Sequence, residues 1–168
     1  MKLFTKAERA TVLYEIAHVA AFNMTAALCR AWKFKYLFHD FEKPFLMMVF
    51  HNNYKKVQTW HRAHNKHHIE YDGDHDYEAM CIDWECSKYT KVNAQLDCVQ
   101  TIAWYVKRDK VSELVVLCGD GNVNDINTWD IVKAATKLGL WNLDEYNKCI
   151  KMSFDELDAI KTSKTKYE

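Results

Sequence analysis

The chain has 168 residues, the size of one ordinary domain, and its apolar (49%) and charged (27%) fractions are those of a globular protein. One proline and four glycines exclude collagen-like and low-complexity chains and favour long helices over many tight turns. Lysine and arginine total 23, as do aspartate and glutamate. The resulting formal charge of zero argues against a polycation, so no stable complex with nucleic acid is expected.

Helical periodicity dominates the first part of the chain. Apolar residues recur at steps of three and four, which predicts a helix over 6–32 with His18 at its middle. A second helix is expected to begin at residue 36 and to carry the dipeptide His39-Asp40. It is expected to end near 41–43, because Pro44 disfavours helical geometry at the residue before it.

Residues 45–91 are expected to contain a histidine-rich helix, a loop and a further helix. Residues 45–50 fit either a short helix or a buried link. A third helix is predicted over 52–70, and it carries four histidines: His61, His64, His67 and His68. Residues 71–76 are rich in aspartate and contain a glycine, which indicates a loop. Asp76 is the expected cap of a fourth helix over 77–91.

The second half of the chain reads as a helical scaffold without site residues. Helices are predicted over 94–108, 127–138, 143–151 and from 154 onward, the last opened by a capping box formed by Ser153 and Glu156. Residues 111–118 fit either a strand or a buried helix, 119–122 predict a break, and 161–168 form a polar tail that is expected to fray.

These elements predict an all-α fold, a single-domain helical bundle of six to eight helices spanning 1–168. A metal-site core is expected at about 15–90, and a C-terminal helical scaffold at about 94–160. The six cysteines form no CxxC pair, no secretory signal is visible, and no stretch of 18 apolar residues could span a bilayer. We therefore expect reduced, mostly buried cysteines, no membrane partner and a cytoplasmic location.

Seven of the eight histidines lie between residues 39 and 75, close to several aspartates, and this density predicts a metal site. The candidate ligands come from separate helices: His18, His39, Asp40 and Asp83. On a helix, neighbouring residues point about 100° apart. One ion can still use both residues of the His39-Asp40 pair, or the carboxylate can bridge to a second ion.

The histidine-rich helix adds a second set of donors. In helical geometry His61, His64, Asn65 and His68 share one face, whereas His67 points to another side. His61 and His68 would then stand two turns apart. They are expected to serve different ions, or one of them would ligate an ion while the other contacts substrate.

The order His18, His39-Asp40, Asp83 resembles the HD superfamily of metal-dependent phosphohydrolases over about residues 15–90. The stretch from His39 to Lys43, the run His61-Arg-Ala-His-Asn-Lys-His-His68 and the pair Asp83-Trp84 look like an uncharacterised family of small phage and bacterial HD-like domains. A second likeness, to the HD-GYP phosphodiesterases, stops at Gly73 because no Tyr-Pro follows. This departure argues against a cyclic dinucleotide substrate.

The resemblance implies a role for each candidate residue. The metal ligands would be His18, His39, Asp40, His61, His68 and Asp83, holding one or two divalent ions (Mn, Mg, Co, Ni, Zn or Fe). The catalytic residues would be Asp40, Lys43, Asn65 and His67. Asp40 would bridge the ions, Lys43 and His67 would contact phosphate, and Asn65 would orient water or substrate. Arg62 and Lys66 are further phosphate candidates, and Glu70 could act as a base or hold a ligand histidine.

The function expected from these residues is hydrolysis of a phosphate ester, most simply that of a nucleotide, by a metal-activated water. The partner would be a small phosphorylated metabolite. If the gene is phage-borne, the location would be the cytoplasm of a bacterial host. Two alternatives stay open: an HD-type di-iron oxygenase, and a non-catalytic, metal-stabilised domain that binds a nucleotide or a protein. Association into a homo-oligomer also stays open.

Overall fold

The computed structural model describes residues 6–90, 96–108, 122–123 and 126–161. Within these ranges it contains eight α-helices and one short 3-10 helix, which confirms the expected all-α, single-domain bundle. The helices are α1 (Lys6–Leu28), η1 (Phe34–Phe38), α2 (Glu42–Val49), α3 (Tyr54–His64), α4 (Tyr77–Thr90), α5 (Cys98–Lys107), α6 (Thr128–Lys137), α7 (Leu143–Lys151) and α8 (Phe154–Lys161).

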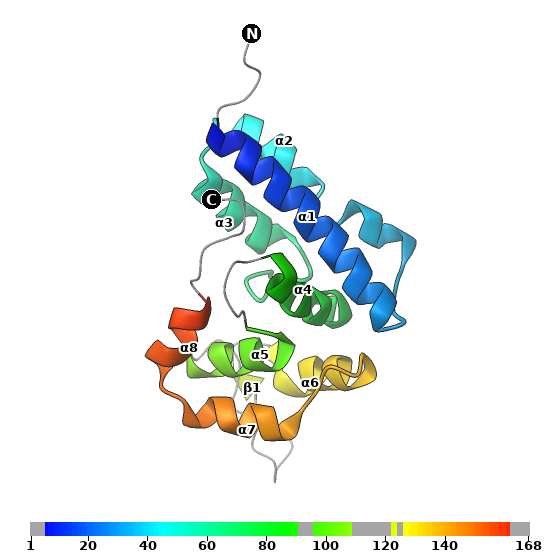
Figure 1. Ribbon diagram of the computed structural model, residues 1–168, viewed down its shortest axis with the longest axis vertical. Helices are drawn as coiled ribbons and strands as arrows, with labels where there is room; N and C mark the ends of the chain where they lie inside the picture. Colours follow the sequence, from blue (N-terminus) through cyan, green and yellow to red (C-terminus); the bar gives the residue numbers. More distant parts are fainter. Residues whose placement is uncertain (1–5, 91–95, 109–121, 124–125, 162–168) are drawn as a thin grey trace.

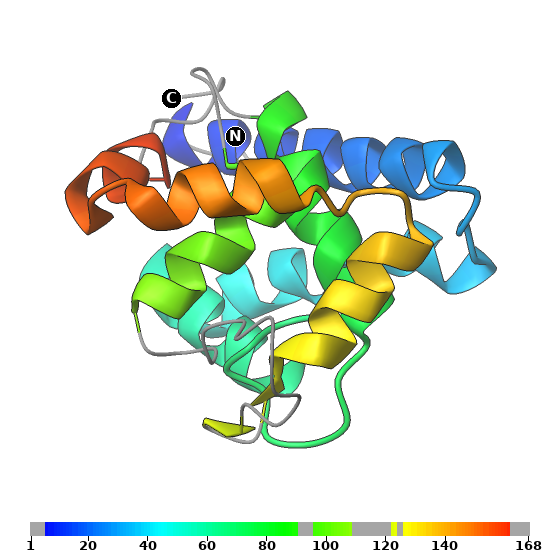
Figure 2. The ribbon, with the colours of Figure 1, turned by 90° about the horizontal axis from the view of Figure 1, so that it is seen from below.

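Helix α4 lies at the centre of the bundle, between α1 on one side and α5 and α6 on the other (Figures 1 and 2). It can occupy this place because its side chains are buried on several faces, and Met80 and Ile82 have no exposed surface. They join one hydrophobic core with Phe22 of α1, Ile102 of α5 and Ile131 of α6. This packing fixes α4 directly against α1.

The C-terminal helices begin and end close to the predicted positions. Helix α7 has the bounds expected from the sequence, and Ser153 and Glu156 form the predicted capping box at the start of α8. Gly139 adopts a left-handed φ of +71° just after α6, which ends that helix at the predicted glycine. Helix α5 packs against α7 and α8, so these elements form the scaffold below α4 (Figure 1).

The prediction for residues 36–50 is wrong in one respect. The His39-Asp40 pair follows a 3-10 helix, and α2 begins at Glu42, so Pro44 lies inside a helix instead of ending one. Proline is tolerated there because the first turn of a helix has no internal partners for its N–H groups. Between η1 and α2, Asp40 has a left-handed φ of +59°, a conformation that aspartate adopts more readily than most residues.

The third helix is also shorter than expected. Helix α3 ends at His64, and Asn65 takes an extended conformation with φ −111° and ψ 127°. The Asn65 side-chain amide donates to the carbonyl oxygen of His61 at 3.1 Å, in addition to the backbone bond that the same oxygen accepts. The chain therefore leaves the helix before His67 and His68, and the helical angles expected for these two histidines do not apply.

Some predictions fall in the stretches outside the described ranges. The alternatives for 111–118 and most of the tail at 161–168 lie there. The helix expected at 94–108 is shorter than predicted, because Asp97 caps it and it spans Cys98–Lys107. Around the break expected at 119–122, the described residues form a short antiparallel ladder of β1 (Asn122–Val123) and β2 (Ile126–Asn127), which was not predicted. Five cysteines are described, all free, and four of them are buried. Among the described helices, none combines the length and apolar character needed to cross a membrane.

Asp76 caps α4 as predicted, and we expect its removal to have a modest effect that depends on pH. Its carboxylate accepts from the backbone N–H of Ala79 (3.1 Å) and from Lys35 (2.5 Å). Burial opposes ionisation of Asp76, but these hydrogen bonds outweigh it and lower its pKa. Asp76→Ala should lower the free energy of unfolding by about 1 kcal/mol at neutral pH.

A carboxylate with a lowered pKa stabilises the fold above its unfolded pKa and loses that contribution as the pH falls. The difference between wild type and Asp76→Ala should therefore shrink as the pH falls below the ordinary value of 3.8. Urea unfolding at several pH values measures this difference. A constant difference down to pH values well below 3.8 would contradict the assignment.

Candidate metal centre

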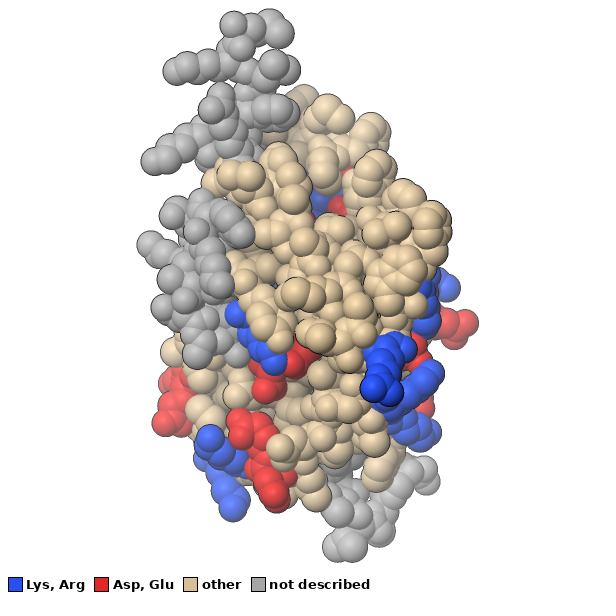
Figure 3. Space-filling view, turned by 45° about the vertical axis from the view of Figure 1, so that its right-hand side comes forward, with Lys and Arg blue, Asp and Glu red and all other residues tan. Residues whose placement is uncertain are grey.

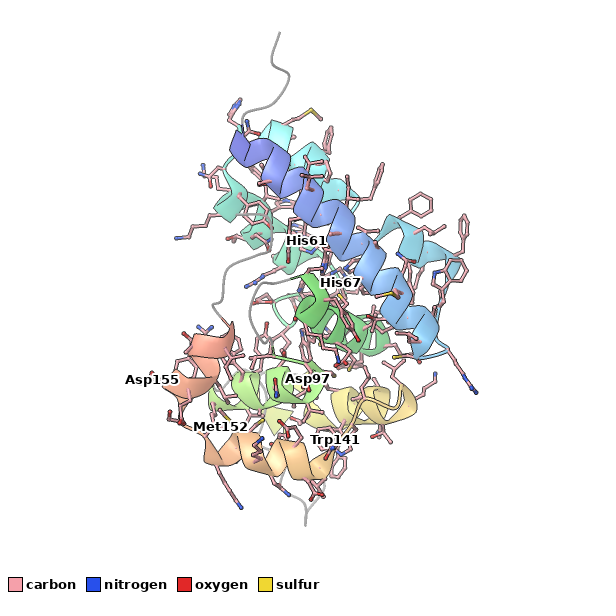
Figure 4. All side chains as sticks on the ribbon, in the orientation of Figure 1. His61, His67, Asp97, Trp141, Met152 and Asp155 are labelled. Carbon is pink, nitrogen blue, oxygen red and sulfur yellow. The ribbon has the colours of Figure 1, made fainter. Side chains whose placement is uncertain are left out.

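The predicted ligands come from several separate elements and meet between α1, α3 and α4. His18 lies on the buried side of α1, and Asp83 faces it from α4. His39 and Asp40 follow η1, where the left-handed backbone of Asp40 places both side chains toward the same centre. Figure 4 labels His61 and His67, which approach the same region from α3 and from the loop after it.

The first group of donors consists of His18, His39 and Asp83. The Nε2 atoms of His18 and His39 lie 2.9 Å and 3.5 Å from Asp83 Oδ1. One ligand atom from each residue lies within 4.8 Å of the others, which is close enough for a single ion to contact all three. Two imidazoles and a carboxylate are suitable donors for a transition metal.

The second group consists of His61, His67 and His68. Their ligand atoms also lie within 4.8 Å of one another, and the Nε2 atoms of His61 and His68 are 2.7 Å apart. The expectation that two helical turns separate His61 and His68 is therefore wrong, because the chain leaves the helix at Asn65 and folds back. His67, expected as a phosphate contact, lies beside His61 and His68 and is also a candidate ligand.

Asp40 connects the two groups through its two carboxylate oxygens. Its Oδ2 lies 3.5 Å from His18 Nε2, while its Oδ1 lies 3.2 Å from His61 Nε2 and 3.4 Å from His67 Nε2. Its Oδ1 also lies 3.5 Å from His39 Nε2, so this oxygen faces imidazoles of both groups. Asp40 is therefore placed to be a ligand that the two groups share.

Three buried atoms at this centre have no hydrogen-bond partner among the described residues: His39 Nε2, Asp40 Oδ1 and His67 Nε2. Burying a polar atom without a partner costs free energy, so such atoms in a native fold call for a ligand or a bound ion. All three atoms are of the type that ligates metals, and they converge on one place. The residues present therefore fit a metal ion.

The protonation of some ligands at the centre matches what a cation requires, and that of others does not. Burial lowers the pKa of His39 to about 4 and also lowers that of His68, which keeps both imidazoles neutral. Burial opposes ionisation of Asp40, but Lys43 and His39 outweigh it, so its pKa falls well below the ordinary range. For His61, the nearby carboxylates of Asp40 and Glu42 overcome burial and raise the pKa, and Cys86 and Asp83 do the same for His18. These two imidazoles must give up their extra protons when a cation binds.

Supporting residues that the sequence did not reveal hold several ligands in place. The Glu42 carboxylate contacts Nδ1 of His61 and also accepts from the Asn65 side chain at 2.9 Å. The Cys86 thiol lies 3.8 Å from His18 Nδ1, and the ring of Phe22 stacks on His39 with centroids 3.7 Å apart. Glu42 could have been found from the sequence, because it lies only two residues after the candidate ligand Asp40.

A second buried network adjoins Asp40. The Lys43 ammonium group lies 2.5 Å from Asp40 Oδ2 and 3.4 Å from Glu15 Oε2, and Tyr54 donates to Glu15 at 3.0 Å. Burial opposes the charge of Lys43, but Asp40 and Glu15 raise its pKa above the ordinary value. Lys43 therefore stays positively charged beside the candidate bridging carboxylate.

The metal centre opens into a cavity of about 350 Å³. It is lined by candidate ligands, by two basic residues and by aromatic side chains: His18, Asp40, His68, Asp83, Lys43, Arg62, Tyr14, Tyr54 and Trp84, with Gln58 and Ser87. A cavity of this size falls within the range that holds small ligands in proteins.

The other candidates have different surroundings. Asn65 bonds to Glu42 and His61, so it positions a ligand and is absent from the cavity wall. Glu70 is half-exposed and lies 3.7 Å from Arg62. Lys66 lines a separate, charged surface groove. The support expected from Glu70 is instead provided by Glu42.

Comparison of the chain with known proteins found no matching family model, no similar curated protein and no similar solved structure. The function is therefore proposed from the geometry of the centre and from the motif residues that form it.

Substitution of Glu42 tests its support of the second donor group. Glu42→Gln keeps the shape of the side chain but removes the charge beside His61 Nδ1. Partners of this kind typically contribute 10–100-fold to metal affinity, and we expect a loss of about that size for one ion of two. Calorimetric titration with a divalent metal measures it. Unchanged affinity for both ions would show that Glu42 does not support a ligand.

Proposed function

We propose that this chain is a metal-dependent phosphohydrolase of the HD type that hydrolyses a phosphate ester of a nucleotide. One observation carries the proposal. Asp40 lies between two groups of metal-ligating side chains, at the wall of a cavity that also contains the cationic side chains of Lys43 and Arg62. Hydrolysis of a phosphate ester needs both features: a place for metal ions and positive charge for the phosphoryl oxygens.

Divalent ions held at such a centre would lower the pKa of a bound water and neutralise charge on the phosphoryl group. The chain's own residues do the rest. Asp40 and Asp83 supply ionised carboxylates, and His39 and His68 supply neutral imidazoles, so no ligand among these four has to lose a proton. Lys43 stays an ammonium group within the cavity wall, where it can donate to a phosphate oxygen.

The aromatic side chains of the cavity favour a nucleotide among phosphate esters. Tyr14, Tyr54 and Trp84 line the same space as the metal ligands. Aromatic rings stack on nucleobases through their π-faces, and each such contact contributes about 1–3 kcal/mol. Arg62 has a half-exposed side chain at the cavity wall, where it can pair with a further phosphate.

An HD-type di-iron oxygenase is the second candidate, because nitrogen donors outnumber carboxylates in the two groups. Imidazole donors suit iron, nickel, copper and zinc, whereas magnesium prefers oxygen donors. Elemental analysis of the purified protein separates the two candidates when combined with spectroscopy. Two irons per chain with a mixed-valence signal, and no phosphate release, would favour the oxygenase.

The proposed activity is tested by loading the protein with manganese, cobalt, nickel or magnesium and screening phosphorylated metabolites for released phosphate. We expect metal-dependent phosphate release from a nucleotide by wild type and by Asp72→Asn, which changes an exposed loop carboxylate. Asp83→Asn changes a carboxylate of the centre in the same way and should be inactive. A metal-loaded protein that releases phosphate from none of the compounds would refute the proposal and favour a binding domain.

A further inference from the structure

Helix α1 carries apolar side chains on its inner side, toward the core, and on its outer side, toward solvent. Its inner side carries Phe22 and Ala26 in the core and His18 at the metal centre. Between residues 10 and 28 the only Asp, Glu, Lys or Arg is Glu15, and Glu15 is buried. The outer side therefore presents apolar side chains to solvent, and Ile16 is 62% exposed. A helix that is apolar all round is normally buried all round.

The exposed residues of α1 form one continuous stripe. From Leu13 onward they recur at steps of three and four along the helix, with two neighbouring residues at its end: Leu13, Ile16, Ala20, Met24, Ala27 and Leu28. This spacing places them on one side of the helix, in the pattern that helices use to pack against each other. Figure 2 shows α1 along an outer edge of the molecule.

The apolar surface continues from α1 onto η1 and α2. The rings of Phe34, Phe38 and Phe41 touch edge to face, with centroids 5.9 Å and 6.2 Å apart, and Phe41 is 74% exposed. Among the described residues, thirteen of the seventeen exposed large hydrophobic side chains lie between residues 12 and 49. Figure 3 shows the result: the upper part of this face is almost free of charged side chains, which gather on the lower part.

The exposed area is large enough for a stable interface. If a fully exposed large side chain contributes about 150 Å², these thirteen expose roughly 1,100 Å² together. A standard stable interface buries about 800 Å² on each partner, whereas the apolar patches of monomers rarely exceed a few hundred Å². The surface thus exceeds what a monomer normally leaves open to water.

We propose that this surface, defined by the α1 stripe together with the exposed side chains of η1 and α2, is the interface with a second copy of the chain. Two identical copies related by a two-fold axis place the same patch on both sides. A charged patch would then meet an identical patch of the same charge and be repelled. This surface avoids that repulsion because it carries almost no charged side chains. Interfaces of homodimers are also more apolar than other protein interfaces.

A lipid surface is a poorer match for the same patch. Helices that lie on membranes combine an apolar side with a polar side rich in lysine and arginine, whereas the opposite side of α1 faces the core. The lysines next to the patch are already paired: Lys33 with Glu78 at 2.8 Å, and Lys35 with Asp76 at 2.5 Å. The net charge of zero offers no attraction to anionic lipid.

A groove of about 530 Å³ between α1 and α2 completes the surface. It is lined mainly by apolar side chains, including Val12 of α1 and Phe45 and Met48 of α2. Side chains from the stripe of a second copy would fill it, as knobs fill holes where helices pack. Because α1 also carries Glu15 and His18, the proposed contact would hold the metal centre's longest helix from its outer side.

Light scattering after size-exclusion chromatography tests the proposal, with metal-loaded protein. Wild type should have twice the chain mass of 19.9 kDa. The double variant Ile16→Lys/Met24→Lys places two charges in the stripe and should have the mass of one chain, with unchanged metal content and helical circular dichroism. The matched control Leu143→Lys/Phe154→Lys changes two exposed apolar residues outside the patch and should stay dimeric.

Three outcomes would overturn the proposal. Wild type could have the mass of one chain at its highest soluble concentration, the stripe variant could stay dimeric, or the control could dissociate as well. A flotation assay with vesicles of phosphatidylcholine and phosphatidylglycerol tests a lipid surface as the alternative partner. Wild type that is monomeric and floats with the vesicles would assign the patch to a lipid surface. None of these outcomes depends on phosphohydrolase activity.

Discussion

Asp40→Asn should abolish turnover and remove metal from the protein together. Both oxygens of Asp40 lie among the imidazoles of the two donor groups, so an amide there removes the charge that two cations would share. Loss of such a ligand should reduce kcat/KM by about 10³-fold or more, which corresponds to roughly 4 kcal/mol. The measurements are elemental analysis and phosphate release on the same preparation.

Asparagine is the appropriate replacement because Asp40 has a left-handed backbone. Asparagine tolerates a φ of +59° about as well as aspartate, whereas alanine would add strain at that position. The variant should therefore fold, and circular dichroism checks this. His75→Ala is the control, since His75 lies outside the two donor groups and the cavity next to them. If Asp40→Asn kept its full metal content, Asp40 would not be a ligand.

Lys43→Met should destabilise the metal-loaded protein by about 3–5 kcal/mol. The substitution keeps the apolar stem but leaves the buried Glu15 carboxylate without its cation, and removing one partner of a buried pair typically costs this much. Asp40 also loses its 2.5 Å contact. Urea unfolding followed by circular dichroism measures the change. Lys133→Met is the control, because the Lys133 side chain is 72% exposed and should change stability by less than about 0.5 kcal/mol.

A second substitution separates loss of the pair from loss of packing. Lys43→Met/Glu15→Gln also removes the Glu15 charge, which the single variant leaves buried without a cation. The double variant should therefore lose about 0.5–3 kcal/mol less unfolding free energy than the sum of the two single losses. Additive losses would show that Glu15 and Lys43 are not coupled. The charged network between α1 and Asp40 would then be incidental to the fold.

The candidate ligands could be found from the sequence because their chemistry is rare at this density. Asp40, His61 and His68 belong to a short stretch of the sequence that contains most of the chain's histidines. The structure brings these residues together with His18, His39 and Asp83. The sequence also predicted how several elements begin or end, as at Asp76 and Gly139, because caps and glycine turns depend on a few neighbouring residues.

The arrangement of the donors could not be found in the same way. The positions of His67 and His68 follow from the end of α3 at His64, where the Asn65 side chain bonds to His61 and to Glu42, which is distant in sequence. Helical angles counted along the sequence assume that the helix continues. The placement of His39 and Asp40 likewise depends on one left-handed residue between two helices, and no periodicity reports that conformation.

The sequence by itself determined that the chain is helical and that it carries imidazole and carboxylate donors on several helices. Only the tertiary structure decided which donors lie within reach of one ion, that Asp40 lies between them, and that the outer stripe of α1 has no partner among the described residues. The physical reason is that the spacing of apolar residues along the sequence shows which sides of a helix are suited to burial. What buries that side depends on contacts between residues far apart in the sequence, or on another molecule.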